Sequence, residues 1–337
     1  MLATHGRGIW IIDDISPLRF LKPELMEKDA AVIESPPAIQ YFQANGGWPE
    51  GDETFNGPSR PTDAFITYYQ KKRHIFGDLK IEIFDPNGKL LDTIAGGKHR
   101  GLNRATWGMR LKPPLIPPAA TVLFEASQGP RVLPGTYTVK LIKGDQTYSG
   151  TLKVVLDPRA KYSLDDRKAQ FDLSMKLYRS LEHMSYATAA IQGVRDDASA
   201  RTAKLGDQDP LRARLQKLAA DSDALRSKIV ATKEGGMITG EERVRELLGK
   251  LYGDVTGYEG RPTDYQADRT DSLARELEDI VIDFHKLTAK ELPGINATLK
   301  KKKLEAIQIP SEDEWKKQHQ GQSASGTTAT RAFREMD

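Results

Sequence analysis

Four side chains near the N-terminus are of types that perform acid–base catalysis or bind a metal ion. They are His5, Arg7, Asp13 and Asp14, within the stretch LATHGRGIWIIDDISPLR. Catalysis by a carboxylate pair requires both groups to flank the same bond of the substrate. Neighbouring residues of a β-strand point to opposite faces, so Asp13 and Asp14 cannot readily form such a pair. We therefore expect these residues to fix a corner of the chain by hydrogen bonds.

Two further histidines lie in segments whose apolar residues recur with the period of a helix. His183 follows Glu182 directly, and His285 lies two residues after Asp283. Metal sites between helices usually use a Glu-x-x-His spacing on facing helices, and neither histidine has a glutamate three residues before it. We predict partly buried or surface histidines, with no metal site and no cofactor.

Aromatic residues of a Gly/Pro-rich segment could bind sugar. They are Tyr41, Phe42, Trp48 and Phe55. Aromatic rings can stack on the apolar face of a pyranose ring. The alternative is that they pack this segment onto a neighbouring domain, because aromatic side chains tend to be buried. We favour packing, and keep Tyr41 and Trp48 as the candidate ligand contacts.

Several enzyme classes leave no trace in the sequence. It contains no GxSxG, GxxxxGK[ST] or GxGxxG motif, so serine hydrolase, P-loop and dinucleotide signatures are missing. It also contains no cysteine, which excludes disulfides, thiol catalysis and thiolate zinc sites. We predict no catalytic residue in this chain.

Composition is ordinary for a folded protein. The 337 residues are 38% hydrophobic and 29% charged, with 50 basic and 47 acidic residues and a net charge of +3. This balance gives no reason to expect binding to nucleic acid or to an anionic membrane. No apolar run approaches the roughly 20 residues of a membrane helix, so we expect no membrane insertion. The stretch Met1–Ile12 lacks the features of a signal peptide.

The first 62 residues contain little regular structure. Residues 1–19 carry one short β-rich run, Ile9–Ile12, which needs a partner either in a distant segment or in a sheet encoded upstream. Residues 20–62 are rich in proline and glycine, which disfavour helix and central strand. We expect a linker there, with a short strand at Ala31–Ile33.

Residues 63–158 have the two-residue period of β-strands. Leu79, Ile81 and Ile83 alternate with polar residues, and Asn87-Gly88 supplies a turn. Trp107 is a candidate core anchor. Short strands at this spacing predict an antiparallel β-sandwich.

Residues 159–309 change to a period of about 3.6. Ser163 and Asp209 are expected helix N-caps, and Pro210 occupies a first helical position. The last long helix is expected to end before Pro293, with a short helical stretch to about Ile307. Long helices with short connections predict an antiparallel helical bundle. Residues 310–337 are predicted to be a disordered tail.

Motifs in all three regions resemble one family. The run THGRGIWIIDDISPLR resembles the closing strand of the last blade in bacterial sortilin-like, BNR (Asp-box) repeat β-propeller proteins, often labelled glycosyl hydrolases. Asp85–Gly88, Asn103–Trp107 and Leu133–Val139 resemble the FlgD-type immunoglobulin-like or fibronectin type III-like module that follows such propellers. Arg261–Tyr265 and Leu292–Asn296 resemble the helical segment after that module.

This resemblance implies a multidomain chain that forms the C-terminal part of a larger secreted protein. Its partner would be the upstream propeller, and its location extracellular, periplasmic or in the cell envelope. The resemblance assigns no catalytic residue to this region, so we expect a non-catalytic structural and interaction region. Two alternatives stay open: an accessory part of a glycoside hydrolase whose active site lies in the propeller, and a carbohydrate-binding module. Protein and glycan are both expected as partner classes, and nucleic acid is not.

Overall fold

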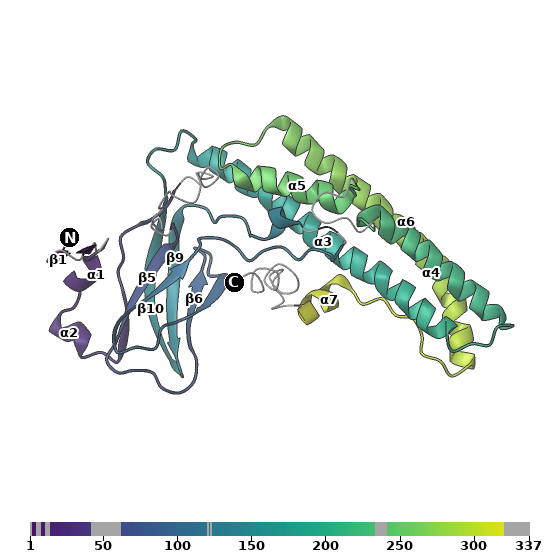
Figure 1. The fold of residues 1–337 in the computed structure, drawn as a ribbon, viewed down its shortest axis with the longest axis horizontal. Helices are drawn as coiled ribbons and strands as arrows, with labels where there is room; N and C mark the ends of the chain where they lie inside the picture. Colours follow the sequence, from purple (N-terminus) through teal and green to yellow (C-terminus); the bar gives the residue numbers. More distant parts are fainter. Residues whose placement is uncertain are drawn as a thin grey trace. The chain divides into compact units, whose positions relative to one another are not determined.

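The chain folds into two compact units of different character. A computed structural model describes residues 2–4, 8–10, 14–41, 62–119, 121, 123–232 and 241–319 (Figure 1). Unit 1 comprises Met1–Lys112 and Arg131–Lys161, and unit 2 comprises Pro113–Pro130 and Tyr162–Asp337. The architecture is mixed α/β, with two larger β-sheets in unit 1 and several helices in unit 2.

The N-terminal strand is paired within the chain. β1 (Leu2–Thr4) and β2 (Gly8–Trp10) are antiparallel, with Leu2 opposite Trp10. This nearby partner was not expected from the sequence, and a further partner in a sheet encoded upstream stays a prediction. Only three residues separate the two strands, a length typical of hairpins, but Leu2-Ala3-Thr4 is too short to give a strand signal of its own.

Unit 1 holds two larger sheets. The five-stranded sheet has the order β4 (Ala38–Gln40), β10 (Gln146–Leu156), β9 (Gly135–Lys143), β6 (Leu79–Phe84) and β7 (Leu90–Ala95). The three-stranded sheet has the order β3 (Ala30–Ile33), β5 (Ala64–Gln70) and β8 (Gly101–Trp107). All neighbours are antiparallel except β4 and β10, which are parallel.

Two segments of the expected linker are strands of these sheets. β3 confirms the predicted strand near Ala31–Ile33 and pairs with β5. β4 was not predicted, and it pairs with β10, more than 100 residues later. The same stretch contains a short helical turn, α2 (Pro23–Met26), and another, α1 (Ser16–Arg19), directly precedes it. The interpretation of residues 20–62 as a linker therefore fails for its described part.

Residues of both larger sheets form one apolar cluster. The predicted alternation is confirmed, because Leu79, Ile81 and Ile83 are buried while Lys80 is exposed. Trp107 of β8 is also buried, as predicted, and meets Tyr137 of β9 edge to face at 5.4 Å. Aromatic pairs of this geometry add about 0.5–1.5 kcal/mol beyond area burial.

Unit 2 is built on long helices whose starts follow the sequence. The helices are α3 (Leu164–Thr202), α4 (Pro210–Ile229), α5 (Val244–Gly257), α6 (Asp264–Lys301) and α7 (Glu312–His319). Ser163 caps α3 through the backbone N–H of Asp166, and Asp209 caps α4. Both predicted caps are confirmed.

Helix α6 continues through Pro293, where we expected it to end. A proline inside a helix costs about 3 kcal/mol. Beyond it, however, Ile295 and Leu299 are fully buried in the same apolar cluster as Leu273 and Leu277. Burial of each side chain contributes about 1.5–3 kcal/mol. This gain offsets the proline and extends the helix by two turns.

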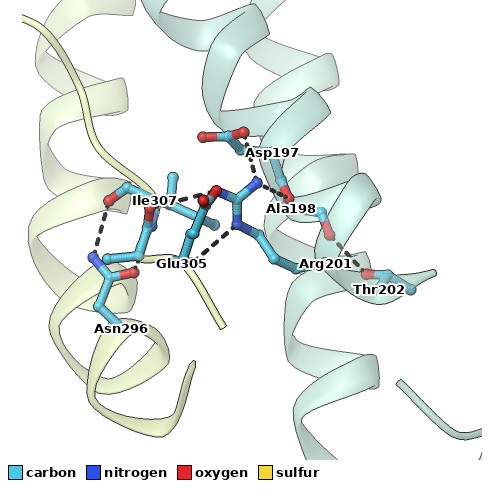
Figure 2. Close-up of polar contacts among 8 residues, drawn as sticks. Asp197, Ala198, Arg201, Thr202, Asn296, Glu305 and Ile307 are labelled. Carbon is cyan, nitrogen blue, oxygen red and sulfur yellow. Dashed lines mark hydrogen bonds and ion pairs between the residues drawn. The ribbon is translucent and has the colours of Figure 1, made fainter. Parts of the chain in front are cut away.

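The chain after α6 is fixed to two helices by polar contacts (Figure 2). The side-chain amide of Asn296 donates to the carbonyl of Ile307 at 3.0 Å and accepts from its N–H at 2.9 Å. Arg201 of α3 donates to the carbonyl of Glu305 at 3.1 Å. The expected helical stretch to about Ile307 is helical only as far as Lys301, the end of α6. Residues 304–307 are not helical, and the backbone groups of Glu305 and Ile307 bond to side chains. The expected tail 310–337 contains α7, and residues 320–337 lie outside the described part.

A proline-rich strap, residues 113–130, belongs to unit 2 although its sequence neighbours belong to unit 1. These residues lie inside the region 63–158 that was expected to form the sandwich, so that domain boundary was wrong for the strap. The strap contains a 3-10 turn, η1 (Phe124–Ala126), that packs on α5. A Cβ placed on Gly249 of α5 would lie 2.4 Å from the methyl carbons of Leu123, so the contact depends on glycine.

Candidate functional site

A groove of about 290 Å³ in unit 1 gathers one of the predicted ligand contacts. Its lining combines two aromatic rings, two prolines, two carboxylates and two aliphatic hydroxyls. The residues are Asp14, Ser35, Pro36, Pro37, Ala38, Ile39, Tyr41, Thr62, Asp63 and Phe65. A volume near 300 Å³ is at the lower end of small-molecule sites.

Strand pairing and hydrogen bonds of the main chain around Tyr41 hold this residue at the groove. It follows β4, where Gln40 pairs with Leu156 of β10. The buried amide of Gln40 donates to the carbonyl of Val132 at 2.8 Å, and Arg131 donates to the carbonyl of Tyr41 at 3.0 Å. The main chain at Tyr41 is therefore fixed on both sides, while the ring is half-buried at the groove.

Other parts of the lining are stiff. Pro36 and Pro37 each have a fixed φ, so the chain between β3 and β4 keeps its form without ligand. Phe65 lies on β5 opposite Thr106. The guanidinium of Arg104 lies 4.8 Å from the centre of the Phe65 ring, within the range of a cation–π interaction.

The two carboxylates come from different segments of the chain. Asp14 accepts a hydrogen bond from the N–H of Ser16 at 2.8 Å, at the start of α1. Asp63 directly precedes β5. Carboxylates accept hydrogen bonds from hydroxyl groups, and aromatic rings offer an apolar face. Because one oxygen of Asp14 is already bonded to the backbone, this arrangement suits binding of a hydroxylated ligand better than proton transfer.

The structure places only part of the predicted aromatic set. Tyr41 lines the groove, whereas Trp48, Phe42 and Phe55 lie outside the described residues. Phe65, Asp14 and Asp63 were not predicted as site residues. The sequence did contain a signal that the side chain of Phe65 lies outside the core. In the strand-like run Ala64–Tyr69, Phe65 and Ile66 point to opposite faces of the strand, so Phe65 faces away from the core when Ile66 is buried in it.

A second depression, of about 330 Å³, lies in unit 2 among α4, α5 and α6. Its charged residues are Lys228, Glu242, Arg243, Glu276, Asp279 and Asp283. Glu242 forms an ion pair with Lys250, and Asp283 pairs with Lys286 at 3.4 Å. Two of its carboxylates are thus neutralised by lysines of their own or a neighbouring helix, and the depression is mainly a charged surface.

The histidines do not form a metal centre in the described part of the chain. His183 Nδ1 lies 3.1 Å from Glu312 of α7, and Nε2 lies 3.9 Å from Glu278 of α6. His285 is on the exposed side of α6. Across the described ranges, no group of three or more His, Asp or Glu side chains is arranged to hold a metal ion. Protonated His183 would link α7 to α3 and α6.

Two deeply buried charged side chains of unit 2 hold the strap. Arg245 and Glu246 of α5 have side chains that are 3% and 8% exposed and pair at 2.7 Å. Arg245 also donates to the carbonyls of Pro117 and Thr121, at 2.8 and 3.1 Å. Glu246 accepts from the hydroxyl of Thr121 at 2.7 Å. These charged groups are occupied in fixing Pro117 and Thr121 onto α5.

Sequence and structure comparisons leave the chain without an assigned family. No protein-family model and no curated protein matches it. A solved structure, that of CopC from Methylosinus trichosporium OB3b, aligns with 12% identity over 40% of this chain and 99% of that chain, with a TM-score of 0.20. A similarity at this level carries no argument about fold or function. None of the described helices is long and apolar enough to cross a membrane.

Proposed function

We propose that this chain is a non-catalytic structural and interaction region of a larger secreted β-propeller protein. The observation that carries the proposal is that two buried charged side chains bond to the chain itself. Arg245 and Glu246, buried side by side, are bonded to the strap and not directed into a cleft. A buried ion pair stabilises only when its remaining hydrogen bonds are made, and here they are made to the chain itself.

In this proposal unit 1 is an immunoglobulin-like or fibronectin type III-like β-sandwich. Two largely antiparallel sheets that share one apolar cluster support it. So do the sequence motifs that resemble a FlgD-type module. Unit 2 is an antiparallel helical bundle, which is supported by the apolar cluster that α3, α4, α5 and α6 share.

The upstream propeller is the proposed partner, with the parent protein outside the cell, in the periplasm or in the cell envelope. The support is the resemblance of the N-terminal run to a closing propeller strand. Reading the coding sequence upstream of Met1 tests this. In-frame Asp-box repeats are the expected result, and an unrelated upstream frame would contradict it. Sedimentation of this chain with the separately produced upstream region should then show a 1:1 complex.

A carbohydrate-binding module is the second candidate, because Tyr41, Phe65 and the carboxylates of Asp14 and Asp63 line one groove. Glycan-array binding by the whole chain, weakened by Tyr41→Ala about three- to tenfold, is the expected result. Tyr265→Ala is the matched control, since Tyr265 on α6 is 72% exposed. Equal binding by wild type and Tyr41→Ala would exclude the groove as a glycan site.

The remaining alternative is an accessory role in a glycoside hydrolase. Its acid and base would then lie in the propeller, and this chain would shape one edge of the active site. Both this alternative and the leading proposal are compatible with hydrolysis by the full parent protein and none by this chain, so that result does not separate them. A loss of turnover when residues of this chain are changed would favour the accessory role.

A further inference from the structure

Two apolar side chains protrude at one end of unit 1. Ile75 and Phe76, in the loop between β5 and β6, are 69% and 85% exposed. Both belong to a larger surface, residues 71–78 and 96–100, which we name the Ile75–Phe76 tip. Contiguous exposed apolar surface that is rimmed by polar residues is typical of sites that contact a protein or a membrane.

The tip is held in shape by hydrogen bonds between its two loops. The N–H of His74 donates to the carbonyl of Lys98 at 3.0 Å, and Lys98 Nζ donates to the carbonyl of Gly77 at 2.8 Å. Gly77, directly after Phe76, has φ = 76°, a conformation that favours glycine. These contacts fix the turn that carries Ile75 and Phe76.

The second loop is anchored from below by buried side chains. The amide of Gln70, which is fully buried, donates to the carbonyl of Gly97 at 2.9 Å, and the hydroxyl of Tyr68 donates to the same carbonyl at 2.8 Å. Asn103 donates to the carbonyl of His99 at 2.7 Å. The exposure of the apolar pair is therefore built into the fold of unit 1.

Positive charge surrounds the apolar pair. Around this end of unit 1, residues 27–29, 71–80, 96–100 and 143–146 include eight lysines and arginines against four acidic residues. Three of the acidic groups are paired, Glu27 with Lys71, Asp29 with Lys143 and Asp78 with Lys80.

The arginines of the tip keep their charge available. Arg73 and Arg100 are exposed, and neither forms an ion pair within the described ranges of the chain. Lys72 is also exposed and acts electrostatically on Asp29. Three exposed cations thus flank an exposed isoleucine and phenylalanine.

We infer that the Ile75–Phe76 tip docks on an anionic phospholipid bilayer. Ile75 and Phe76 enter the interface between headgroups and acyl chains, while Arg73, Arg100 and Lys72 contact phosphate groups. Shallow apolar insertion combined with basic residues is the physical basis of interfacial membrane binding.

A bilayer fits this surface better than a protein partner does. A stable protein interface buries about 800 Å² on each side around an apolar centre, and the tip offers two apolar residues ringed by charge. A bilayer needs no complementary shape. The inference departs from the expectation, based on overall charge, that the chain avoids anionic membranes. It concerns surface docking and no spanning helix.

Vesicle co-sedimentation of the full 337-residue chain tests the inference. The probes are vesicles of phosphatidylcholine alone and vesicles with about one third phosphatidylglycerol, at 0.1 M salt. We expect binding to the anionic vesicles only. Arg73→Gln/Arg100→Gln should bind about 25-fold more weakly, at about fivefold for each cation. Ile75→Ser/Phe76→Ser should bind at least tenfold more weakly on the same vesicles.

Matched controls separate the tip from general charge and hydrophobicity. Lys300→Gln/Lys301→Gln removes the same charge from the exposed end of α6, and Tyr265→Ser/Ile282→Ser removes exposed apolar groups from the same helix. Both should bind within twofold of wild type, and far-UV circular dichroism should confirm folding of all variants.

Three results would overturn the inference. They are no binding to anionic vesicles, equal weakening by the control variants, and wild-type binding by Ile75→Ser/Phe76→Ser. Sedimentation velocity adds an arm for protein contact. If Ile75→Ser/Phe76→Ser abolishes self-association and leaves vesicle binding unchanged, the tip contacts protein and the inference fails.

Discussion

Replacement of Arg245 by methionine should detach the proline-rich strap from α5. The change keeps an unbranched, flexible side chain and removes the guanidinium with all of its donors. The guanidinium makes contacts of 2.7–3.1 Å to Glu246, to Thr121 through its hydroxyl and carbonyl, and to the carbonyl of Pro117. In Arg245→Met these acceptors lose their donor and Glu246 keeps a buried charge.

The structure sets the expected size of this effect. Removal of one partner of a buried ion pair costs about 3–5 kcal/mol, chiefly because the other charge stays buried without compensation. We expect a loss in this range in the free energy of unfolding of unit 2. Combination with Glu246→Gln should recover at least about 1 kcal/mol, since the uncompensated charge is then absent.

Urea unfolding followed by circular dichroism at 222 nm measures the helices of unit 2. Limited proteolysis within residues 113–130 measures release of the strap, and Arg245→Met should be cleaved faster there. The control is Arg214→Met, because Arg214 is half-exposed and lies 3.4 Å from Glu291. An exposed pair of this kind is worth less than about 1 kcal/mol. Equal effects of Arg245→Met and Arg214→Met would refute the assigned role of Arg245.

Two further predictions concern helices of unit 2. The pKa of Asp166 is lowered to about 2 by hydrogen bonds from Ser163 and Arg261, so its contribution to stability is present above pH 4 and is lost as pH falls through about 2. Asp166→Asn should flatten the pH dependence of the unfolding midpoint between pH 4 and 2, and an unchanged slope would contradict the cap. Pro293→Ala should raise the stability of unit 2 by about 1–3 kcal/mol in urea unfolding, because it restores a backbone donor inside α6. A destabilised variant would show that Pro293 has a packing role.

Local signals in the sequence were sufficient where the structure is local. The alternation of Leu79, Ile81 and Ile83 predicted a half-buried strand, and the helix caps at Ser163 and Asp209 depend on neighbours within three residues. These features need no knowledge of distant contacts.

Contacts between distant residues explain the errors. β4 has three residues and depends on pairing with Val154–Leu156, which no local pattern encodes. The strap packs on α5 because the carbonyl of Pro117 accepts a hydrogen bond from Arg245, which lies 128 residues later in the sequence. Helix α6 passes Pro293 because burial of Ile295 and Leu299 outweighs local propensity.

The candidate groove was predictable by one residue only. Tyr41 stood out as an aromatic in a Gly/Pro-rich segment, whereas Asp14, Asp63 and Phe65 approach it from segments that are separate in sequence. The Ile75–Phe76 tip was missed for a different reason. A net charge of +3 averages the whole chain and conceals a basic cluster that forms when two loops meet.

Turnover by the purified chain is the most direct test of a non-catalytic role. The assay is release of a chromogenic leaving group from a panel of α- and β-glycosides at pH 5 and pH 7, with Asp14→Asn and Asp63→Asn alongside. The account predicts the same rate as buffer for all three proteins. Hydrolysis by wild type that either substitution abolishes would contradict it.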